Sequence, residues 1–152
     1  MSVLEPIEAW FRLQGWTPMP FQRQCWQAYL AGESGLLQVP TGSGKTYAAV
    51  MGPIAEMLAA QPGQESRAKT SHGLQLLVLT PLRALSRDLA LAIEEPISAM
   101  GWPLRVAIRN GDTSSHERSK QLRTPPQILI TTDQLADLIP HQRTADAELV
   151  AG

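Results

Sequence analysis

The stretch VPTGSGKT, residues 39–46, decides the expected fold of this chain. An apolar run at residues 36–39 leads into it, and apolar residues at helical spacing follow it, from Ala48 to Leu58. A strand, a glycine-rich turn and a helix in this order are typical of a phosphate-binding loop, because glycines let the backbone close tightly around an anion. The N-terminus of the helix adds a positive dipole end. The segment predicts a nucleotide-triphosphate site in an α/β fold.

The polar residues of this loop have separate expected roles. Lys45 would reach the terminal phosphates of ATP as a point charge, and Thr46 would place its hydroxyl on the accompanying Mg²⁺. These two residues are the predicted catalytic side chains, and Thr46 is the predicted link to the metal. The strict pattern has glycine where this chain has Val39, so a turn that merely precedes a helix is the alternative. The predicted phosphate-binding residues are Thr41, Gly42, Ser43, Gly44, Lys45 and Thr46.

Strand and helix patterns alternate along the rest of the chain. Helices are expected after the loop and at residues 5–14, 22–31, 83–100, 115–122 and 134–139. Strands are expected at residues 36–39, 74–80, 104–108 and 127–131. The apolar run of the second strand is nearly continuous, which is typical of a strand covered on both faces. The alternation predicts a parallel sheet with helices on both faces.

Helical periodicity also predicts which side chains face the core. In the first helix these are Leu4, Ile7, Trp10 and Phe11. In the second they are Cys25, Trp26, Tyr29 and Leu30. In the helix at residues 83–100 they are Leu85, Leu89, Ile93 and Ile97. Pro53, next to Gly52, is expected to bend the helix that follows the loop.

The composition is that of one globular domain. The chain has 152 residues, of which 43% are hydrophobic, and a net charge of −1, so a nucleic-acid partner would need a local basic groove. The single cysteine, Cys25, excludes an internal disulfide. The first residues lack a basic and apolar leader, and no apolar run approaches the roughly 20 residues of a membrane span. A soluble cytoplasmic protein without a membrane partner is expected.

Four segments together resemble superfamily-two helicases. The loop at residues 39–46 is similar to motif I of these proteins, in which the first glycine is commonly replaced. The segment LTPLRAL, residues 79–85, resembles motif Ia, and ITTDQL, residues 130–135, occupies the place of motif Ib. Upstream, TPMPFQ at residues 17–22 resembles the Q-motif. The resemblance implies a P-loop NTPase with a RecA-like motor domain and a parallel sheet.

Two further segments make the resemblance more particular. Gly15-Trp16 precedes the Q-motif-like segment, and RNGDT occupies residues 109–113. The ordered set is similar to the large helicase-related (Lhr-type) DExH-box group, especially its ligase-associated DNA-repair branch. Residues 1–152 would then be the first RecA-like ATP-binding domain. The resemblance implies an ATP-dependent helicase that acts on single-stranded or partly duplex nucleic acid, with DNA as the expected substrate and a repair ligase or nuclease as family-implied partners; a preference for DNA over RNA does not follow from the sequence.

The resemblance also implies roles for individual residues. Gln22 would read the adenine of ATP, although an ordinary polar residue at a helix start is the alternative. Arg83 would bind a backbone phosphate, with a surface salt bridge as the alternative. Trp10, Phe11 or Trp16 could cover the adenine. The predicted nucleic-acid contacts are Thr80, Arg83, Gly111, Asp112 and Thr132; Gly111 and Asp112 alone would signal only a turn.

Two departures from the family pattern limit the expected activity. Asp133 and its neighbours stand where the family usually has Pro-Glu-Ser. No hydrophobic strand ends in the Asp-Glu box that holds Mg²⁺ and orients the attacking water; in the family it would follow shortly after Gly152. Because positioning and charge stabilisation supply most of phosphoryl-transfer catalysis, the chain alone is predicted to bind nucleotide but to hydrolyse little or none.

Two other functions remain open at this point. A small P-loop kinase or nucleotide transferase would share the loop, but the ordered helicase-like segments argue against it. A non-catalytic nucleotide-binding module would bind without turnover under all conditions. The basic residues Arg118, Lys120 and Arg123 could contact a phosphate backbone or form a solvated face.

Overall fold

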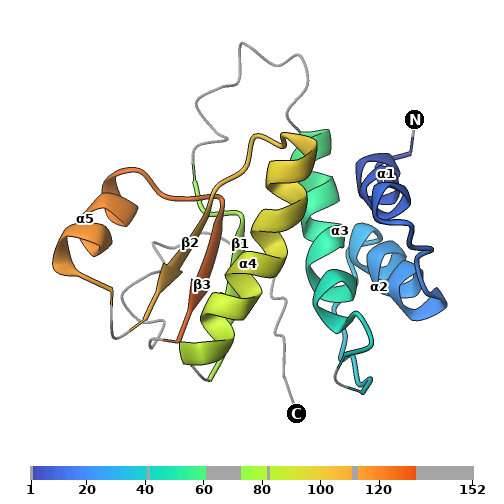
Figure 1. Ribbon diagram of the computed structural model, residues 1–152, viewed down its shortest axis with the longest axis horizontal. Coiled ribbons are helices and arrows are strands. Elements are labelled where there is room, and N and C mark those ends of the chain that lie inside the picture. Colours follow the sequence, from blue (N-terminus) through green and yellow to red (C-terminus); the bar gives the residue numbers. More distant parts are fainter. Residues whose placement is uncertain (1, 41, 61–72, 82, 111–112, 133–152) are drawn as a thin grey trace.

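The computed structural model describes residues 2–40, 42–60, 73–81, 83–110 and 113–132 (Figure 1). The elements within these ranges are α1 (Glu5–Gln14), α2 (Pro20–Leu30), α3 (Lys45–Ala59), β1 (Leu76–Leu79), α4 (Arg83–Met100), β2 (Val106–Arg109), α5 (Ser115–Arg123) and β3 (Ile128–Thr131). Among the helices so described, none has the length and apolar character needed to cross a bilayer. The predicted helix at residues 134–139 lies outside the described residues, as does most of the polar stretch at residues 61–73.

The sheet has the strand order β1-β3-β2, and both pairings are parallel. Ile128 of the central strand aligns with Leu76 on one side and with Val106 on the other. All four residues of β3 are buried. The prediction of an α/β fold with a parallel sheet is therefore confirmed. Because the strands are parallel, their carboxyl ends lie at one edge, where Leu79 and Arg109 flank Thr131.

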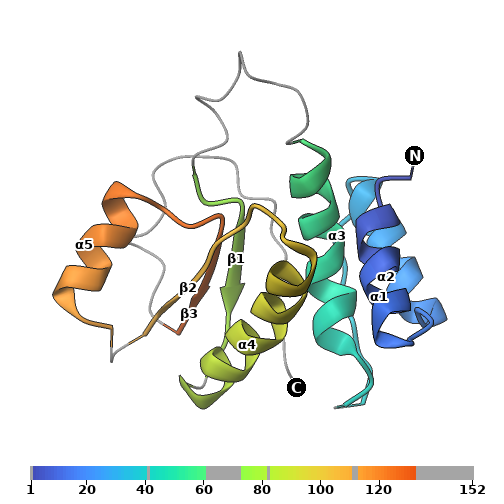
Figure 2. The ribbon, with the colours of Figure 1, turned by 45° about the horizontal axis from the view of Figure 1, so that its top comes forward.

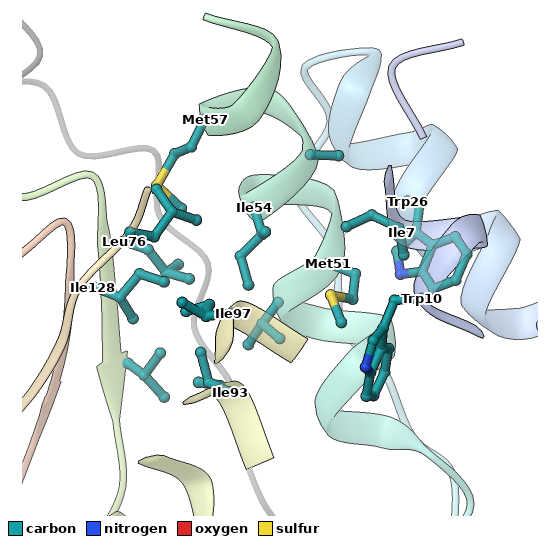
Figure 3. Close-up of a cluster of buried hydrophobic side chains, with 14 of the residues drawn as sticks. Ile7, Trp10, Trp26, Met51, Ile54, Met57, Leu76, Ile93, Ile97 and Ile128 are labelled. Carbon is teal, nitrogen blue, oxygen red and sulfur yellow. The ribbon is translucent and has the colours of Figure 1, made fainter. Parts of the chain in front are cut away.

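One face of the sheet carries a packed helical layer. Figures 1 and 2 show α4 beside the sheet, α3 beyond it, and α1 and α2 on the outer side of α3. One continuous apolar core connects these layers (Figure 3). The side chains that span it include Ile128, Leu76, Ile93, Ile97, Ile54, Met51, Ile7, Trp10 and Trp26.

Helix α5 does not form the second helical layer that was predicted. It lies beside the β2 edge of the sheet in both views, where Gln121 Nε2 donates to the Ile108 carbonyl at 3.0 Å, and none of its side chains is buried. Its sequence, SHERSKQLR, has no apolar stripe that could pack on the sheet. Accordingly, Leu77 and Leu79 of β1 are only half-buried, while Leu76 and Val78 are buried. The prediction that this strand, β1, is covered on both faces is therefore wrong, whereas β3 is buried along its whole length.

The three N-terminal helices form a compact group. Helix α1 has the predicted bounds and buries Leu4, Ile7, Trp10 and Phe11, as expected. Helix α2 packs along α3, and the Tyr29 side chain of α2 lies against Gly52 of α3. A Cβ atom at this position would lie 3.1 Å from Cδ1 of Tyr29. Helix α3 continues through Pro53 to Ala59.

The predicted strand at residues 36–39 is wrong. The backbone there has no regular structure, and Leu36 is 68% exposed. A short apolar run forms a strand only where a neighbouring strand offers its N–H and C=O groups, and within the described sheet neither pairing involves these residues. Apolar character alone could not reveal whether such a neighbour was present.

Two helices present a different face from the predicted one. In α4, Ser86 and Ala90 are buried, whereas Leu85 is 36% exposed and Leu89 is half-buried. In the first half of α4, small side chains therefore face inward, and the leucines beside them remain partly exposed. In α2, the buried residues are Gln22 and Trp26, while Leu30 is exposed and Cys25 and Tyr29 are half-buried.

Candidate nucleotide site

The glycine-rich loop has a backbone that only glycine adopts readily. Gly42 has φ +84° and Gly44 has φ +87°, both in the left-handed region. Helix α3 begins immediately afterwards, and Ala48 N–H makes the first hydrogen bond within it, to the Gly44 carbonyl at 3.2 Å. No side chain caps the start of this helix in the described structure. Its first N–H groups therefore remain available for an anion.

The loop lies at the edge of the molecule where a ligand is expected. In Figures 1 and 2, the start of α3 is at the end toward which the strands point. Open parallel sheets bind their ligands at the carboxyl ends of their strands. Lys45 and Thr46 are half-buried in the first turn of α3. The hydroxyl of Ser43 donates to the Pro40 carbonyl, which closes the loop on itself; Thr41 lies outside the described residues.

Gln22 connects helix α2 to the loop. Its side chain is buried at 4% exposure, its Oε1 accepts from Met19 N–H at 2.8 Å, and its Nε2 donates to the Gly44 carbonyl at 3.1 Å. The first bond caps α2, and the second holds the loop residue that precedes α3. The contact is close, because a Cβ atom on Gly44 would lie 2.5 Å from Nε2. The structure thus brings Gln22 to the phosphate loop.

An aromatic cluster stands beside the loop. Trp10 and Phe11 are buried, at 0% and 2% exposure, so neither can stack on a ligand. Trp16 is 47% exposed and makes edge contacts with both, at ring-centroid distances of 5.4 and 5.9 Å. It also lies 6.2 Å from the ring of Tyr47, in the first turn of α3. Of the three aromatic candidates, Trp16 is the one whose ring is exposed enough to contact a ligand.

Sequence reasoning missed Tyr47. Its carbonyl accepts from Trp26 Nε1 at 2.8 Å, and its hydroxyl donates to the Ala92 carbonyl of α4 at 3.0 Å. Burial, with a smaller effect of the Glu95 charge, raises the pKa of the Tyr47 hydroxyl above its usual value. Tyr47 directly follows Thr46, so its contacts hold the turn that carries Lys45 and Thr46.

The carboxyl edge of the sheet assembles several predicted nucleic-acid contacts. Thr80 N–H bonds the Thr131 carbonyl at 3.1 Å, and Thr132 N–H bonds the Arg109 carbonyl at 3.2 Å. The Thr80 Oγ1 atom is buried and has no hydrogen-bond partner among the described residues. Arg83 is exposed as the first residue of α4. Gly111 and Asp112 lie outside the described residues.

The basic residues of α5 divide into two kinds. Arg118 holds the preceding turn, because its Nη2 donates to the Asn110 carbonyl at 2.9 Å and its Nε to the Thr113 carbonyl at 3.3 Å. Lys120 and Arg123 are exposed. The described parts of the chain contain no group of three or more His, Cys, Asp or Glu residues that could hold a metal ion.

Comparison with known proteins places these features in a family context. Residues 19–151 match the DEAD/DEAH box helicase family. The chain is 39% identical over 140 residues to ATP-dependent helicase Lhr-Core protein 2 of Thermococcus barophilus, covering 86% of this chain and 16% of the relative. It is 34% identical over 135 residues to the Lhr helicase/probable uracil glycosylase of Mycolicibacterium smegmatis, covering 82% of this chain and 9% of the relative. The chain spans only a small part of both relatives.

Solved structures show the same similarity. The Mycobacterium smegmatis helicase Lhr bound to ssDNA and AMP-PNP matches with a TM-score of 0.71 and 30% identity, over 87% of this chain and 18% of that chain. The DUF1998 helicase MrfA bound to DNA and AMPPNP matches with a TM-score of 0.68 and 26% identity, over 84% of this chain and 16% of that chain. The fold is that of a RecA-like helicase motor domain.

Proposed function

The chain belongs to the DEAD/DEAH box helicase family, and from this membership we propose that it is the first, ATP-binding domain of an ATP-dependent helicase motor that acts on DNA. The observation that carries the proposal is the uncapped start of α3 behind two left-handed glycines. A side chain on Gly44 would collide with Gln22, so the loop accepts no bulk there. This arrangement fits a triphosphate, whose oxygens accept from backbone N–H groups.

Lys45 and Thr46 supply the side-chain chemistry in this proposal. Lys45 binds the terminal phosphates through its charge, and the Thr46 hydroxyl joins the ligands of Mg²⁺. When bound with ATP, Mg²⁺ neutralises charge on the terminal phosphates. Lys45 and Thr46 are adjacent in the first turn of α3, where the helix dipole also favours negative charge.

Gln22 and Trp16 fit the base end of the nucleotide. The Gln22 amide uses one N–H for Gly44 and one oxygen lone pair for Met19, so it keeps a second donor and a second lone pair; because the side chain is only 4% exposed, an adenine edge would reach them only after neighbouring side chains shift. Trp16 provides an exposed aromatic face close to the first turn of α3. This assignment makes Gln22 both a support of the loop and a reader of adenine.

The nucleic-acid strand is proposed to run along the carboxyl edge of the sheet. Thr132 and Arg83 would contact its phosphates, joined by Gly111 and Asp112 from the neighbouring turn; the Thr80 hydroxyl, whose Oγ1 atom is buried, would join them only once it is uncovered. The solved Lhr and MrfA structures contain DNA, which supports DNA as the substrate. A role in DNA repair, with a ligase or nuclease partner, rests on the resemblance of the motifs alone.

A binding titration tests the nucleotide site. Mg·AMP-PNP added to the chain in a calorimeter should bind, and Lys45→Ala should weaken binding at least about tenfold, because a charge-assisted phosphate contact is lost. Lys120→Ala is the matched control, since this exposed lysine lies on α5. Unchanged affinity in Lys45→Ala would remove Lys45 from the site.

Two further readouts separate the proposed function from its alternatives. Single-stranded DNA that strengthens nucleotide binding would support a helicase domain, whereas phosphate transfer to a small-molecule acceptor would identify a transferase. The chain is expected to hydrolyse little or no ATP, because its sequence contains no Asp-Glu box. Rapid turnover by the chain alone would contradict this expectation.

A further inference from the structure

Tyr47 makes contacts with three other helices from a single position. Its ring lies 5.0 Å from that of Trp10 in α1, its carbonyl accepts from Trp26 in α2, and its hydroxyl donates to Ala92 in α4. It does so from the first turn of α3, one residue beyond Thr46. A displacement of this turn would therefore act on all three neighbours.

The contact with α4 has a specific cause in the sequence. In an α-helix, the carbonyl of Ala92 would accept from the N–H of residue 96. Residue 96 is proline, which has no N–H, and it lies inside α4. The Ala92 carbonyl thus lacks its usual helical partner, and the Tyr47 hydroxyl occupies that place at 3.0 Å. Pro96 and Tyr47 form a matched pair across the interface between α3 and α4.

We propose that Tyr47 is a positioning residue that transmits nucleotide binding at the loop to helix α4. This inference rests on the proposed function of the loop. Phosphate bound at the start of α3 would shift or stiffen the turn that contains Tyr47, and the hydrogen bond would pass this change to Ala92. Apolar contacts are non-directional, whereas a hydrogen bond fixes both distance and direction. It is therefore the contact best suited to carry the change.

The consequence reaches the proposed nucleic-acid edge. Helix α4 begins at Arg83, which follows the end of β1 and Thr80. A helix moves nearly as a rigid unit over the distance from Ala92 to Arg83, so a change at Ala92 alters the position of Arg83. Nucleotide binding and strand binding would then be coupled through α4, with Tyr47 at the contact between them.

Hydrogen exchange on the chain tests this assignment. Mg·AMP-PNP, at concentrations shown by calorimetry to saturate each variant, should slow amide exchange in α4 of the unmodified chain. Tyr47→Phe should still bind nucleotide but lose the slowing in α4. Tyr29→Phe is the matched control: it also removes one phenol hydroxyl, in α2 near the Glu56 carboxylate of α3, and should retain the slowing.

A double variant separates positioning from simple stability. Pro96→Ala supplies an N–H that can satisfy the Ala92 carbonyl within α4. In Tyr47→Phe/Pro96→Ala, the helix has its own hydrogen bond again while the connection to α3 stays absent. The slowing in α4 should therefore remain lost. Its return in the double variant would overturn the proposal, because Tyr47 would then serve only to satisfy a carbonyl.

The remaining outcomes are equally decisive. Normal slowing in Tyr47→Phe, or no response of α4 when nucleotide is bound to the unmodified chain, would also overturn the assignment of Tyr47 while leaving nucleotide binding established. Failure of the unmodified chain to bind Mg·AMP-PNP would instead overturn the proposed function, and this inference with it. The calorimetric titration distinguishes these two kinds of failure.

Discussion

At the scale of single residues, the sequence predicts the glycines of the phosphate loop. It does not predict the side chains of other helices that hold the loop in place. The glycines could be predicted because phosphate binding needs left-handed backbone, which Gly42 and Gly44 adopt. The bond from Gln22 to the Gly44 carbonyl could not, because it joins residues from two helices whose packing no local pattern specifies. The role of Tyr47 had one available signal, the proline four residues after Ala92.

The two loop glycines provide a matched pair of substitutions. Gly42→Ala should destabilise the fold by about 1–2 kcal/mol, the usual cost of a left-handed non-glycine residue. Gly44→Ala should lower the free energy of unfolding by about 1 kcal/mol more, because its Cβ would displace Gln22 Nε2 and break the hydrogen bond to the loop. A Cβ on Gly42, by contrast, would have nothing within 4 Å. Urea unfolding measures both. Equal losses of unfolding free energy in the two variants would show that the hydrogen bond from Gln22 to Gly44 contributes nothing to stability.

At the scale of elements, the sequence predicts where a helix begins and ends better than it predicts which face of the helix is buried. Both α1 and α4 have the expected bounds, because their apolar periodicity is long. The buried face of α4 is different, since Ser86 and Ala90 face inward where leucines were expected. A pattern of hydrophobicity predicts that the largest apolar side chains are buried. Where a helix packs closely on its neighbours, however, only small side chains fit between them. The strand predicted at residues 36–39 failed because strand formation depends on a partner.

The contact between α2 and α3 should not tolerate a methyl group at Gly52. Alanine improves helix propensity by about 1 kcal/mol, but its Cβ would lie 3.1–3.3 Å from three Tyr29 atoms. Overpacking costs about 1–3 kcal/mol, so Gly52→Ala should destabilise the chain by about 1 kcal/mol in urea unfolding. Tyr29→Ala/Gly52→Ala should remove this penalty relative to Tyr29→Ala. A stabilised Gly52→Ala variant would show that the helices can separate freely.

The contact between α3 and α4 should appear as an energetic coupling. Tyr47→Phe leaves the Ala92 carbonyl without the hydroxyl and should lower the free energy of unfolding by about 1 kcal/mol. In a Pro96→Ala background, the loss should be smaller, because the helix supplies its own donor. A double-mutant cycle by urea unfolding measures the difference. Additive effects would contradict the pairing of Tyr47 with Pro96.

At the scale of the whole molecule, the sequence predicts the class of the sheet but not its arrangement. Alternating strands and helices imply parallel pairing, which the structure confirms. The order β1-β3-β2 depends on where β3 inserts, and no local pattern encodes that. The failure of α5 to bury any side chain could have been predicted from its lack of an apolar stripe. The site residues meet because parallel strands end at one edge.

Alkaline pH should destabilise the molecule through two tyrosines. Burial, followed by the hydrogen bond and charge of Glu56, raises the pKa of Tyr29 from 10.0 to about 12. A raised pKa means that the folded state holds the proton more tightly, so this stabilisation is present below the unfolded pKa of 10.0 and is lost as the pH rises toward about 12. Tyr47 acts in the same direction.

Unfolding measured across this alkaline range checks the effect. The Tyr29→Phe variant should lose stability less steeply than the unmodified chain over the same pH interval, since it has no proton to release at this position. The two proteins differ only by this hydroxyl, so other effects of pH are common to both and cancel in the comparison. Parallel pH profiles would show that the Tyr29 hydroxyl has the same pKa in the folded and unfolded chains.

The separation of the strands along the chain has a consequence for the order of folding. Helices α1, α2 and α3 all lie within the first 59 residues and pack on one another, so they can associate after short loops close. Strand β1 must instead wait for β3, since Leu76 aligns with Ile128. Distant pairings are slow to form because loop-closure entropy must be overcome first. The helical group that supports the phosphate loop is thus expected to assemble early, and the pairing of β1 with β3 is expected to form late.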